Sequence, residues 1–216
     1  MKIKNLFYLI PLVFLASACD EMNINANGPI ITETRSVAAF TSIDSSLPAN
    51  IIITQGDDQN LTIRTYGNVI GLIQSDVVNA ELRLGLKRSV RNLERLDVYI
   101  TAADYERLNL SGAARLSTEG CLEIDKLSIR LSGASETNLC GIANELDVEL
   151  SGASSFKAYD MPTNIVNVSV SGASDVRVSA NELLDVTISG AASIRYKGNP
   201  EISSSISGAG SLINAN

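Results

Sequence analysis

The stretch LDVELSGASSFKAY, residues 146–159, shows the repeat that decides the fold. Its tripeptide Ser-Gly-Ala occurs six times in the second half of the chain, starting at Ser111, Ser132, Ser151, Ser171, Ser189 and Ser207. The successive steps are 21, 19, 20, 18 and 18 residues. A period of about 20 residues is too short for a two-helix repeat or a propeller blade, and it is typical of one coil of a β-solenoid.

The residues before each tripeptide alternate between apolar and polar. In the segment LDVEL, residues 146–150, two acids separate three aliphatic residues, and every copy has Leu, Ile or Val directly before its Ser. A period of two predicts a strand with one buried face. Because each place keeps its chemistry from copy to copy, we expect neighbouring coils to stack in register as parallel strands.

The tripeptide itself predicts a corner. Glycine is favoured where φ is positive or where two backbones approach closely, and Ala fits a cramped inner corner. We expect the corner glycines to form one stacked column: Gly112, Gly133, Gly152, Gly172, Gly190 and Gly208. A catalytic nucleophile elbow would need a following helix and a nearby base, and the repeat supplies neither.

These patterns predict an all-β chain, folded as a parallel β-helix of about 20-residue coils. Strand twist and the usual hand of crossover connections favour the right-handed form. Residues 108–216 would form its regular part. A looser third side of each coil would absorb the differences in repeat length.

Residues 33–107 are rich in strand signals but do not keep the period. Alternating or β-branched runs predict strands at residues 40–43, 50–55, 61–65, 80–86 and 96–101. The segment QGDDQN, residues 55–60, predicts a hairpin-type turn, and residues 72–78 and 90–96 are expected to be short helical or irregular links. We expect irregular coils that cover the N-terminal end of one continuous domain, residues 33–216.

The N-terminal sequence MKIKNLFYLIPLVFLASAC predicts a lipoprotein signal peptide. Its apolar stretch, residues 6–16, is shorter than the roughly 20 residues that a membrane-spanning helix needs. Small residues lead directly into Cys19, as in a bacterial lipobox, so that residues 1–18 would be removed and Cys19 would be lipidated. Ordinary cleavage after Ala18, which would release a free protein, is the alternative.

Residues 19–32 are polar, contain Gly and Pro, and predict a flexible tether to the membrane. The pair Asp20-Glu21 resembles the acidic export signals of surface lipoproteins in Bacteroidota. In other Gram-negative bacteria an Asp at this place indicates retention in the inner membrane. We expect a lipid anchor in the cell envelope, most simply in the outer membrane, and the leaflet stays open.

The chain is acidic and has an aliphatic core composition. Its formal charge is −7, and loss of residues 1–18, which carry two lysines and no acid, changes this to −9. An acidic chain argues against nucleic acid as a partner. Without Trp and with 5% aromatic residues, one domain would be built mainly from Leu, Ile and Val.

Nothing in the sequence indicates catalysis. The chain has no His, which removes His-based acid–base chemistry and most zinc sites, and we expect neither a metal nor a cofactor. Polysaccharide-active enzymes on β-helices use clustered carboxylates. The outward acids here are scattered over different columns and form no recognisable pair: Glu136, Glu149, Asp160 and Asp175. A polysaccharide-active enzyme is therefore the remote alternative.

One outward column collects cations. Four places past the Ala stand Lys157, Arg177 and Arg195 in three successive copies, and stacked coils would space them by about 4.8 Å. Such a row is a candidate site for an anionic glycan or a carboxylate-bearing partner. The alternative is an ordinary solvated face, on which neighbouring acids screen the row.

Two cysteines precede successive tripeptides by the same interval. Cys121 and Cys140 both lie 11 residues before the next Ser-Gly-Ala, which would place them side by side on adjacent coils, within the Cα distance of a disulfide. Stacked buried thiols are the alternative, since parallel neighbours often point their side chains alongside each other.

The chain resembles the adhesin family of bacterial surface lipoproteins that is known by its head GIN domain. The shared features are the lipoprotein signal, the entry segment FTSIDSSLPANIIITQGDDQNLTIRTYGNVI and the trailing LSGAS repeats, over roughly residues 36–214. The resemblance implies a right-handed parallel β-helix in the cell envelope. It supplies no catalytic residues.

We therefore expect a non-catalytic, lipid-anchored envelope protein that binds a glycan or a protein surface as an adhesin. The alternative from another class is a structural spacer or self-assembling scaffold, since the end of a solenoid exposes unpaired strand edges. The last coil, SSSISGAGSLINAN, has no charged or Pro-bearing cap, so that copies of the chain could associate there as homo-oligomers.

Overall fold

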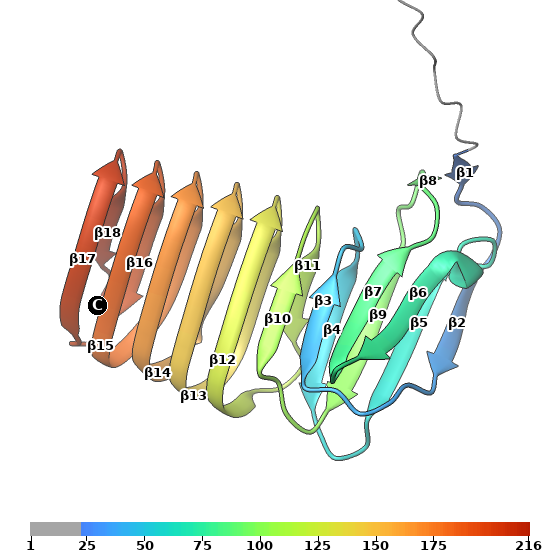
Figure 1. Cartoon of the computed structure of the whole chain (residues 1–216), viewed down its shortest axis with the longest axis horizontal. Coiled ribbons are helices and arrows are strands. Elements are labelled where there is room, and N and C mark those ends of the chain that lie inside the picture. Colours follow the sequence, from blue (N-terminus) through green and yellow to red (C-terminus); the bar gives the residue numbers. More distant parts are fainter. Residues whose placement is uncertain (1–22) are drawn as a thin grey trace, which may run out of the picture.

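The computed structural model describes residues 23–216, and it shows a solenoid of strands whose two ends differ in shape (Figure 1). The predicted β-helix is confirmed: consecutive coils pair as parallel strands at a spacing of roughly 20 residues. The predicted signal peptide and Cys19 lie outside the described residues.

The C-terminal half is built from coils that repeat one pattern. Its strands are β10 (Arg107–Leu110), β11 (Arg115–Thr118), β12 (Leu122–Gly133), β13 (Glu136–Gly152), β14 (Ser155–Gly172), β15 (Asp175–Gly190), β16 (Ser193–Lys197), β17 (Glu201–Gly208) and β18 (Ser211–Asn214). The long strands β13, β14 and β15 bend around the coil, so that each contributes to two opposite faces (Figure 1).

The N-terminal half contains shorter and more varied strands. They are β1 (Ile24–Asn25), β2 (Ile30–Arg35), β3 (Ser42–Ser45), β4 (Asn50–Gln55), β5 (Asn60–Tyr66), β6 (Ile73–Val78), β7 (Glu81–Leu86), β8 (Val90–Arg91) and β9 (Leu96–Ala102), with one short 3-10 helix, η1 (Ile70–Leu72).

Two sheets face each other across the core. The front sheet, which faces the viewer in Figure 1, runs in the order β6, β7, β3, β10, the C-terminal parts of β12 to β15, and β17. The back sheet runs β2, β5, β9, β4, β11, the N-terminal parts of β13 to β15, β16 and β18. Its nine steps of about 4.8 Å give a length of about 43 Å.

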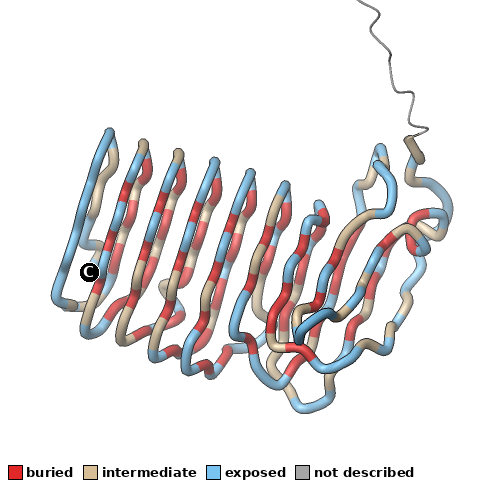
Figure 2. Tube along the Cα trace, in the orientation of Figure 1, coloured by how far each residue is buried: buried red, intermediate tan, exposed pale blue. Residues whose placement is uncertain are grey.

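The core consists of in-register columns of aliphatic side chains. On the front sheet Leu127, Leu146 and Val166 are neighbours in successive coils, and all three are buried. On the back sheet Phe156 and Val176 follow each other in the same way. Figure 2 shows buried and outward-facing residues alternating along the regular coils that precede the last one, whose strand β17 is exposed throughout. The alternation read from the sequence therefore sets the inside and the outside of each sheet.

The corner glycines lie where the sequence placed them, in one stacked column with positive φ. At Gly152 φ is 94°, and a Cβ added there would lie 2.6 Å from the backbone oxygen of Gly133. The column therefore needs glycine for two reasons at once: the left-handed backbone and the close approach of the coil beneath.

The third side of each coil carries the irregularities. Between β14 and β15 the register shifts between Ala158 and Pro162 and again between Thr163 and Ile165. The extra residues of the longer coil are thus accommodated as irregularities on this side, and the strands of the front and back sheets stay in register.

The N-terminal half departs from two predictions. Residues 55–60 do not close a two-stranded hairpin, because β9 lies between β4 and β5, parallel to the first and antiparallel to the second. Residues 73–78 form a strand rather than a link, since β6 pairs antiparallel with β7 through a turn at Asn79 and Ala80. Both turn residues have positive φ, 53° and 58°, as a tight hairpin requires.

The predicted tether, residues 19–32, also differs from the structure over its described part. β1 pairs with β8, and β2 pairs antiparallel with β5 from Ile30 onward. The Asn68 side chain holds the segment between them, donating to the oxygen of Asn25 at 2.8 Å and accepting from the N–H of Asn27 at 3.0 Å. The polar composition of this segment gave no sign of these pairings, because they are made by backbone groups and by the side-chain amide of Asn68, which is distant in sequence.

Candidate functional site

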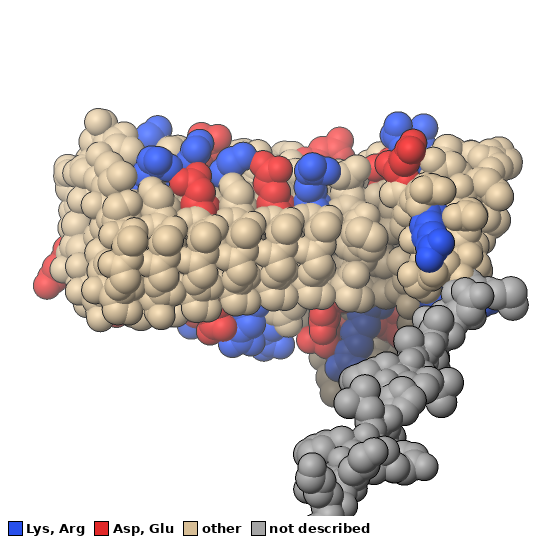
Figure 3. Space-filling view, turned by 90° about the horizontal axis from the view of Figure 1, so that it is seen from above, with Lys and Arg blue, Asp and Glu red and all other residues tan. Residues whose placement is uncertain are grey.

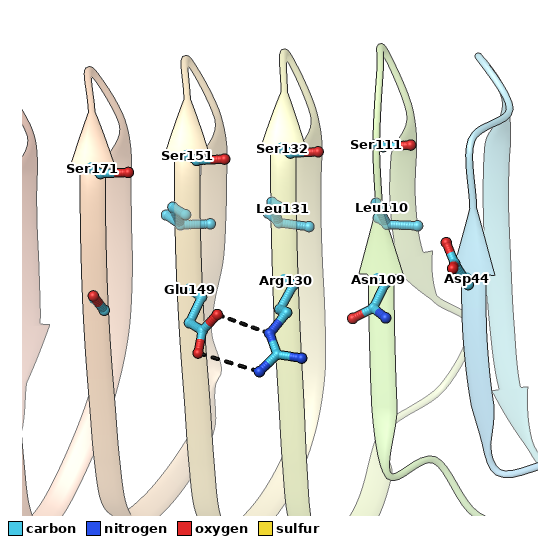
Figure 4. A pocket seen from close by; sticks show the side chains of 12 residues that line it. Asp44, Asn109, Leu110, Ser111, Arg130, Leu131, Ser132, Glu149, Ser151 and Ser171 are labelled. Carbon is cyan, nitrogen blue, oxygen red and sulfur yellow. Dashed lines mark hydrogen bonds and ion pairs between the residues drawn. The ribbon is translucent and has the colours of Figure 1, made fainter.

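A shallow groove crosses the front sheet near the corners, with a volume of about 400 Å³. Its floor is one outward column in which Asp44, Asn109, Arg130 and Glu149 are register neighbours on β3, β10, β12 and β13. Figure 4 shows these four side chains on successive strands below a row of corner serines. The parallel register spaces them by about 4.8 Å. We call this column and its rim of serines the polar groove.

Within the polar groove, two side chains bind each other and two do not. The Arg130 Nε donates to Glu149 Oε2 at 2.8 Å, and the two side chains are 53% and 58% exposed. Such an exposed pair contributes about 0–1 kcal/mol, so a ligand can replace it at little cost. The hydrogen bond that Arg130 donates to Glu149 raises the pKa of Arg130, which keeps the guanidinium charged.

Asp44 and Asn109 keep unused hydrogen-bonding capacity. In the part of the chain that the structure describes, the exposed Asp44 carboxylate has no ion-pair partner. The half-buried Asn109 has an Oδ1 atom that accepts no hydrogen bond. A polar atom left without a partner is costly, and because this oxygen is covered in the structure, a ligand donor would gain that energy only if the Asn109 side chain turned toward the groove. The groove thus combines an acceptor, an amide and a cation.

The neighbouring outward column extends the polar surface. Asn167 donates to Asp147 Oδ1 at 2.7 Å, and Lys126 lies 3.2 Å from Asp147 Oδ2. A second hollow of about 390 Å³ lies over this column and shares Arg130 and Glu149 with the polar groove. Charged groups of both signs and amides therefore cover several coils.

The predicted row Lys157, Arg177 and Arg195 lies on the back sheet, in one register column. Each of the three is paired: Lys157 Nζ lies 2.6 Å from Glu136 Oε1, and Asp175 binds both arginines. Figure 3 shows acidic and basic side chains interleaved along the flank of the solenoid rather than a continuous basic stripe. The row's role as an anion site stays a prediction.

The acids of this flank are less scattered than the sequence suggested. Glu136 and Asp175 share one column, with Ser155 between them. The hydrogen bond from Lys157 is the main cause that lowers the pKa of Glu136, and Arg115 adds to it. Glu136 therefore pairs with Arg115 and Lys157, and Asp175 pairs with Arg177 and Arg195.

The two cysteines form a disulfide across adjacent coils. Cys121 and Cys140 are bonded, with their Cα atoms 4.6 Å apart, directly before the register pair Leu122 and Gly141. Cys121 is exposed and Cys140 half-buried, so the pair lies at the surface rather than as stacked buried thiols. The bond fastens β12 to β13.

Sequence reasoning missed two polar ladders, one inside the corners and one on the third side of the coils. After the tripeptide, the buried Ser135, Ser154 and Ser174 donate to the glycine carbonyls of the preceding coil, each at 3.4 Å. On the third side Asn164 bonds Asn144 at 3.1 Å, and Asn181 bonds Asn164 at 3.3 Å. The signal was a Ser directly after Ala, and Asn at similar places of three repeats.

The described residues contain neither a metal-binding cluster of side chains nor a membrane-spanning helix. Across residues 23–216, no group of three or more His, Cys, Asp or Glu side chains is placed to hold a metal ion. No helix among these residues has the length and apolar character to cross a membrane.

Residues 39–200 match the profile of the family described as "Putative auto-transporter adhesin, head GIN domain". The chain belongs to this family. A search of curated proteins finds no match.

Several solved structures share the fold. A protein of Bacteroides fragilis described as a "putative adhesin" is 28% identical, with a TM-score of 0.75 over 89% of this chain and 100% of its own. A "putative lipid binding protein" of Parabacteroides distasonis is 20% identical, with a TM-score of 0.61 over 90% and 100%. A "putative adhesin" of Parabacteroides merdae is 17% identical, with a TM-score of 0.55 over 90% and 99%.

Proposed function

We propose that this protein is a non-catalytic adhesin of the cell envelope, anchored by a lipid on Cys19, that binds a glycan along its polar groove. The family and the Bacteroides fragilis structure carry the adhesin description. The sequence Ala-Ser-Ala-Cys before Asp20 supports the anchor. We place the anchor in the outer membrane, as the pair Asp20-Glu21 would indicate in Bacteroidota.

The unused polar groups of Asp44 and Asn109 carry the proposal for the groove. A sugar hydroxyl both donates and accepts, so it can bind the Asp44 carboxylate, the Asn109 amide and the Arg130 guanidinium in turn. The column repeats about every 4.8 Å along the solenoid, which suits an extended polymer that lies parallel to the axis. The two carboxylates in the groove disfavour an anionic glycan there.

The direct test is a glycan array and titration calorimetry with the soluble form that begins at Asp20. The double variant Asp44→Ala/Asn109→Ala should lower affinity for the best neutral oligosaccharide about tenfold or more, equivalent to about 1.4 kcal/mol or more. Asn138→Ala is the matched control, because Asn138 is an exposed amide on the back sheet. It should leave affinity within about twofold.

Two results would contradict the groove. One is full binding by the double variant. The other is loss of binding in a Lys157→Ala/Arg177→Ala/Arg195→Ala variant that keeps its fold, which would assign the ligand to the back sheet instead. If the protein bound protein surfaces and no glycan, the adhesin role would stand, but its ligand would be a protein instead of a glycan.

A further inference from the structure

The two ends of the solenoid differ in how their edge strands are closed. At the N-terminal end the guanidinium of Arg35 on β2 donates to the backbone oxygens of Ile70 at 2.8 Å and Ile73 at 2.7 Å. It also pairs with Glu33 at 2.7 Å, and its side chain is only 16% exposed. This largely buried charge occupies the carbonyl at the start of β6 and one in η1, which disfavours the addition of another strand at that place.

The C-terminal coil has no such device. β17 pairs with β15 on one side, and no strand among residues 23–216 pairs with its other side. Its inward column ends in Ile202 and Ile206, which are 42% and 43% exposed, although their register partners Leu184 and Ile188 are buried. Only Glu201 is charged from residue 201 to residue 216. A nearly uncharged strand edge with two exposed isoleucines therefore faces solvent.

The sequence of β17 is self-complementary. The segment ISSSI, residues 202–206, reads the same in both directions about Ser204. When such a strand pairs antiparallel with its own copy around Ser204, Ile202 lies opposite Ile206 of the second copy. The central Ser204 then lies opposite itself. Residues two apart share a face, so both isoleucine pairs cover the open end of the core.

We propose that two copies of this chain join end to end through β17, antiparallel and centred on Ser204. The two-fold axis of this dimer is perpendicular to the front sheet, and it also crosses the back sheet behind it. The back-sheet edge strand β18 therefore faces β18 of the second copy. The contact is closed by its own two-fold symmetry, because each copy uses its β17 edge to bind the β17 edge of the other. Two copies and no more would associate.

The size of this end predicts a weak dimer. β17 has eight residues, and the two sheets lie about 10 Å apart, which gives a contact on the order of 300 Å² per copy. Stable interfaces bury about 800 Å² per partner. We therefore expect association at high local concentration, such as between proteins crowded on surfaces.

The position of the anchor gives this dimer a function. β1 lies at the end of the solenoid opposite the last coil (Figure 1). Cys19 precedes Asn23 by four residues, a chain length of at most about 14 Å. A dimer joined through the C-terminal coils therefore places its two anchors at its opposite ends. It would bridge two facing membranes, so the second copy itself becomes the adhesive partner. This last step rests on the proposed lipid anchor.

A charge swap at the two-fold axis tests the dimer. Sedimentation of the soluble form, up to roughly 1 mM protein, should show dimers of the unchanged chain. Ser204→Lys alone and Ser204→Glu alone should be monomeric, because two like charges then face each other. An equimolar mixture of the two variants should associate more strongly than either variant alone, although the inward position of Ser204 gives the ion pair a desolvation cost. Ser169→Lys, at an exposed position on the outer face of β14 two coils from the end, is the control that should not change association.

Each remaining outcome overturns a stated part of the proposal. A chain that stays monomeric at all concentrations overturns the dimer, and so does association that ignores both charges at Ser204. Assemblies larger than two overturn the closed contact. Neither result touches the groove, whose glycan binding is measured separately with variants at Asp44 and Asn109.

Vesicles that carry the lipidated chain test the bridge. Mixing vesicles bearing Ser204→Lys with vesicles bearing Ser204→Glu should cluster them, whereas vesicles of either variant alone should stay apart. Absence of clustering in a mixture that dimerises in solution would overturn the bridging geometry.

Discussion

The regular coils of residues 108–216 and the N-terminal half of the solenoid use the same two sheets but are specified differently. In the coils, each strand pairs in register with the equivalent residues one repeat away, as Leu146 does with Leu127 and Val166. In the N-terminal half, β5 and β9 are antiparallel, and β9 separates two strands that are consecutive in the chain. The first region is built by repetition and the second by unique long-range contacts.

Side chains show the same contrast. The coils rely on glycine corners and on the buried serines that follow them. The N-terminal half instead relies on single side chains that bond distant backbone groups, such as Arg35 and Tyr105. A substitution in a repeated element should therefore destabilise the neighbouring coils, whereas loss of a unique contact should destabilise only its surroundings in the N-terminal half.

The strongest break should come from a corner glycine. Gly152→Ala introduces a Cβ at 2.6 Å from the oxygen of Gly133 and strains a φ of 94°. Strain of this kind costs about 1–3 kcal/mol, and the clash adds to it, so we expect a loss of about 4 kcal/mol in the free energy of unfolding. Denaturant titration measures it.

Two other glycines separate the causes of that loss. Gly120→Ala strains a φ of 81° with nothing within 4 Å, and it should cost about 1 kcal/mol. Gly71→Ala meets neither obstacle and should change stability by less than about 0.5 kcal/mol. Equal losses at Gly152 and Gly120 would show that the stacked column is not what requires glycine.

Reduction of the disulfide should have the next largest effect. Cys121 and Cys140 are 19 residues apart, and closing such a loop stabilises by about 3 kcal/mol in the chain-entropy account. A Cys121→Ser/Cys140→Ser variant should lose about that much, and reductant should then have no further effect on it. An unchanged unfolding midpoint would mean that the coils hold this junction without the bond.

Tyr105 tests the unique contacts of the N-terminal half. Its hydroxyl lies 2.9 Å from the oxygen of Thr54 and 3.0 Å from that of Ile100, and burial raises the pKa of Tyr105 above its usual range, so the group stays a neutral donor. Tyr105→Phe leaves buried carbonyls without this donor and should cost about 1–2 kcal/mol. Tyr99→Phe, at a residue 38% exposed, is the control that should cost little.

The smallest effect concerns the ion pairs of the back sheet. The bond from Lys157 lowers the pKa of Glu136, so its contribution exists above the unfolded pKa and is lost as pH falls through the folded value. Lys157→Met should raise the pKa of Glu136 in an NMR titration and change stability at neutral pH by less than about 0.5 kcal/mol. An unshifted Glu136 pKa would contradict the pairing.

The repeat was enough to predict the solenoid, its buried columns and the glycine corners, because stacking turns one sequence pattern into one spatial column. It also placed Lys157, Arg177 and Arg195 in one row. It further placed Glu136 and Asp175 two columns away as screening acids, but it could not show that Glu136 binds Lys157 and that Asp175 binds both arginines, since these pairings depend on side-chain reach across two columns.

The polar groove was harder to find from the sequence. Arg130 and Glu149 were visible as outward residues of the repeat, but Asp44 belongs to the irregular half. Its place beside Asn109 follows from the pairing of β3 with β10, which are more than 60 residues apart in the chain. No period relates the two segments, so only the structure brings this part of the groove together.

Hydrogen–deuterium exchange of the Gly152→Ala variant tests most directly whether the two halves are specified in different ways. Repeats that interact only with their neighbours can open locally, whereas a cap held by its own contacts stays closed. We predict faster exchange in β13, β14 and β15, with the protection of β4, β5 and β9 unchanged. Equal loss of protection in both groups of strands would contradict the account and show one cooperative unit.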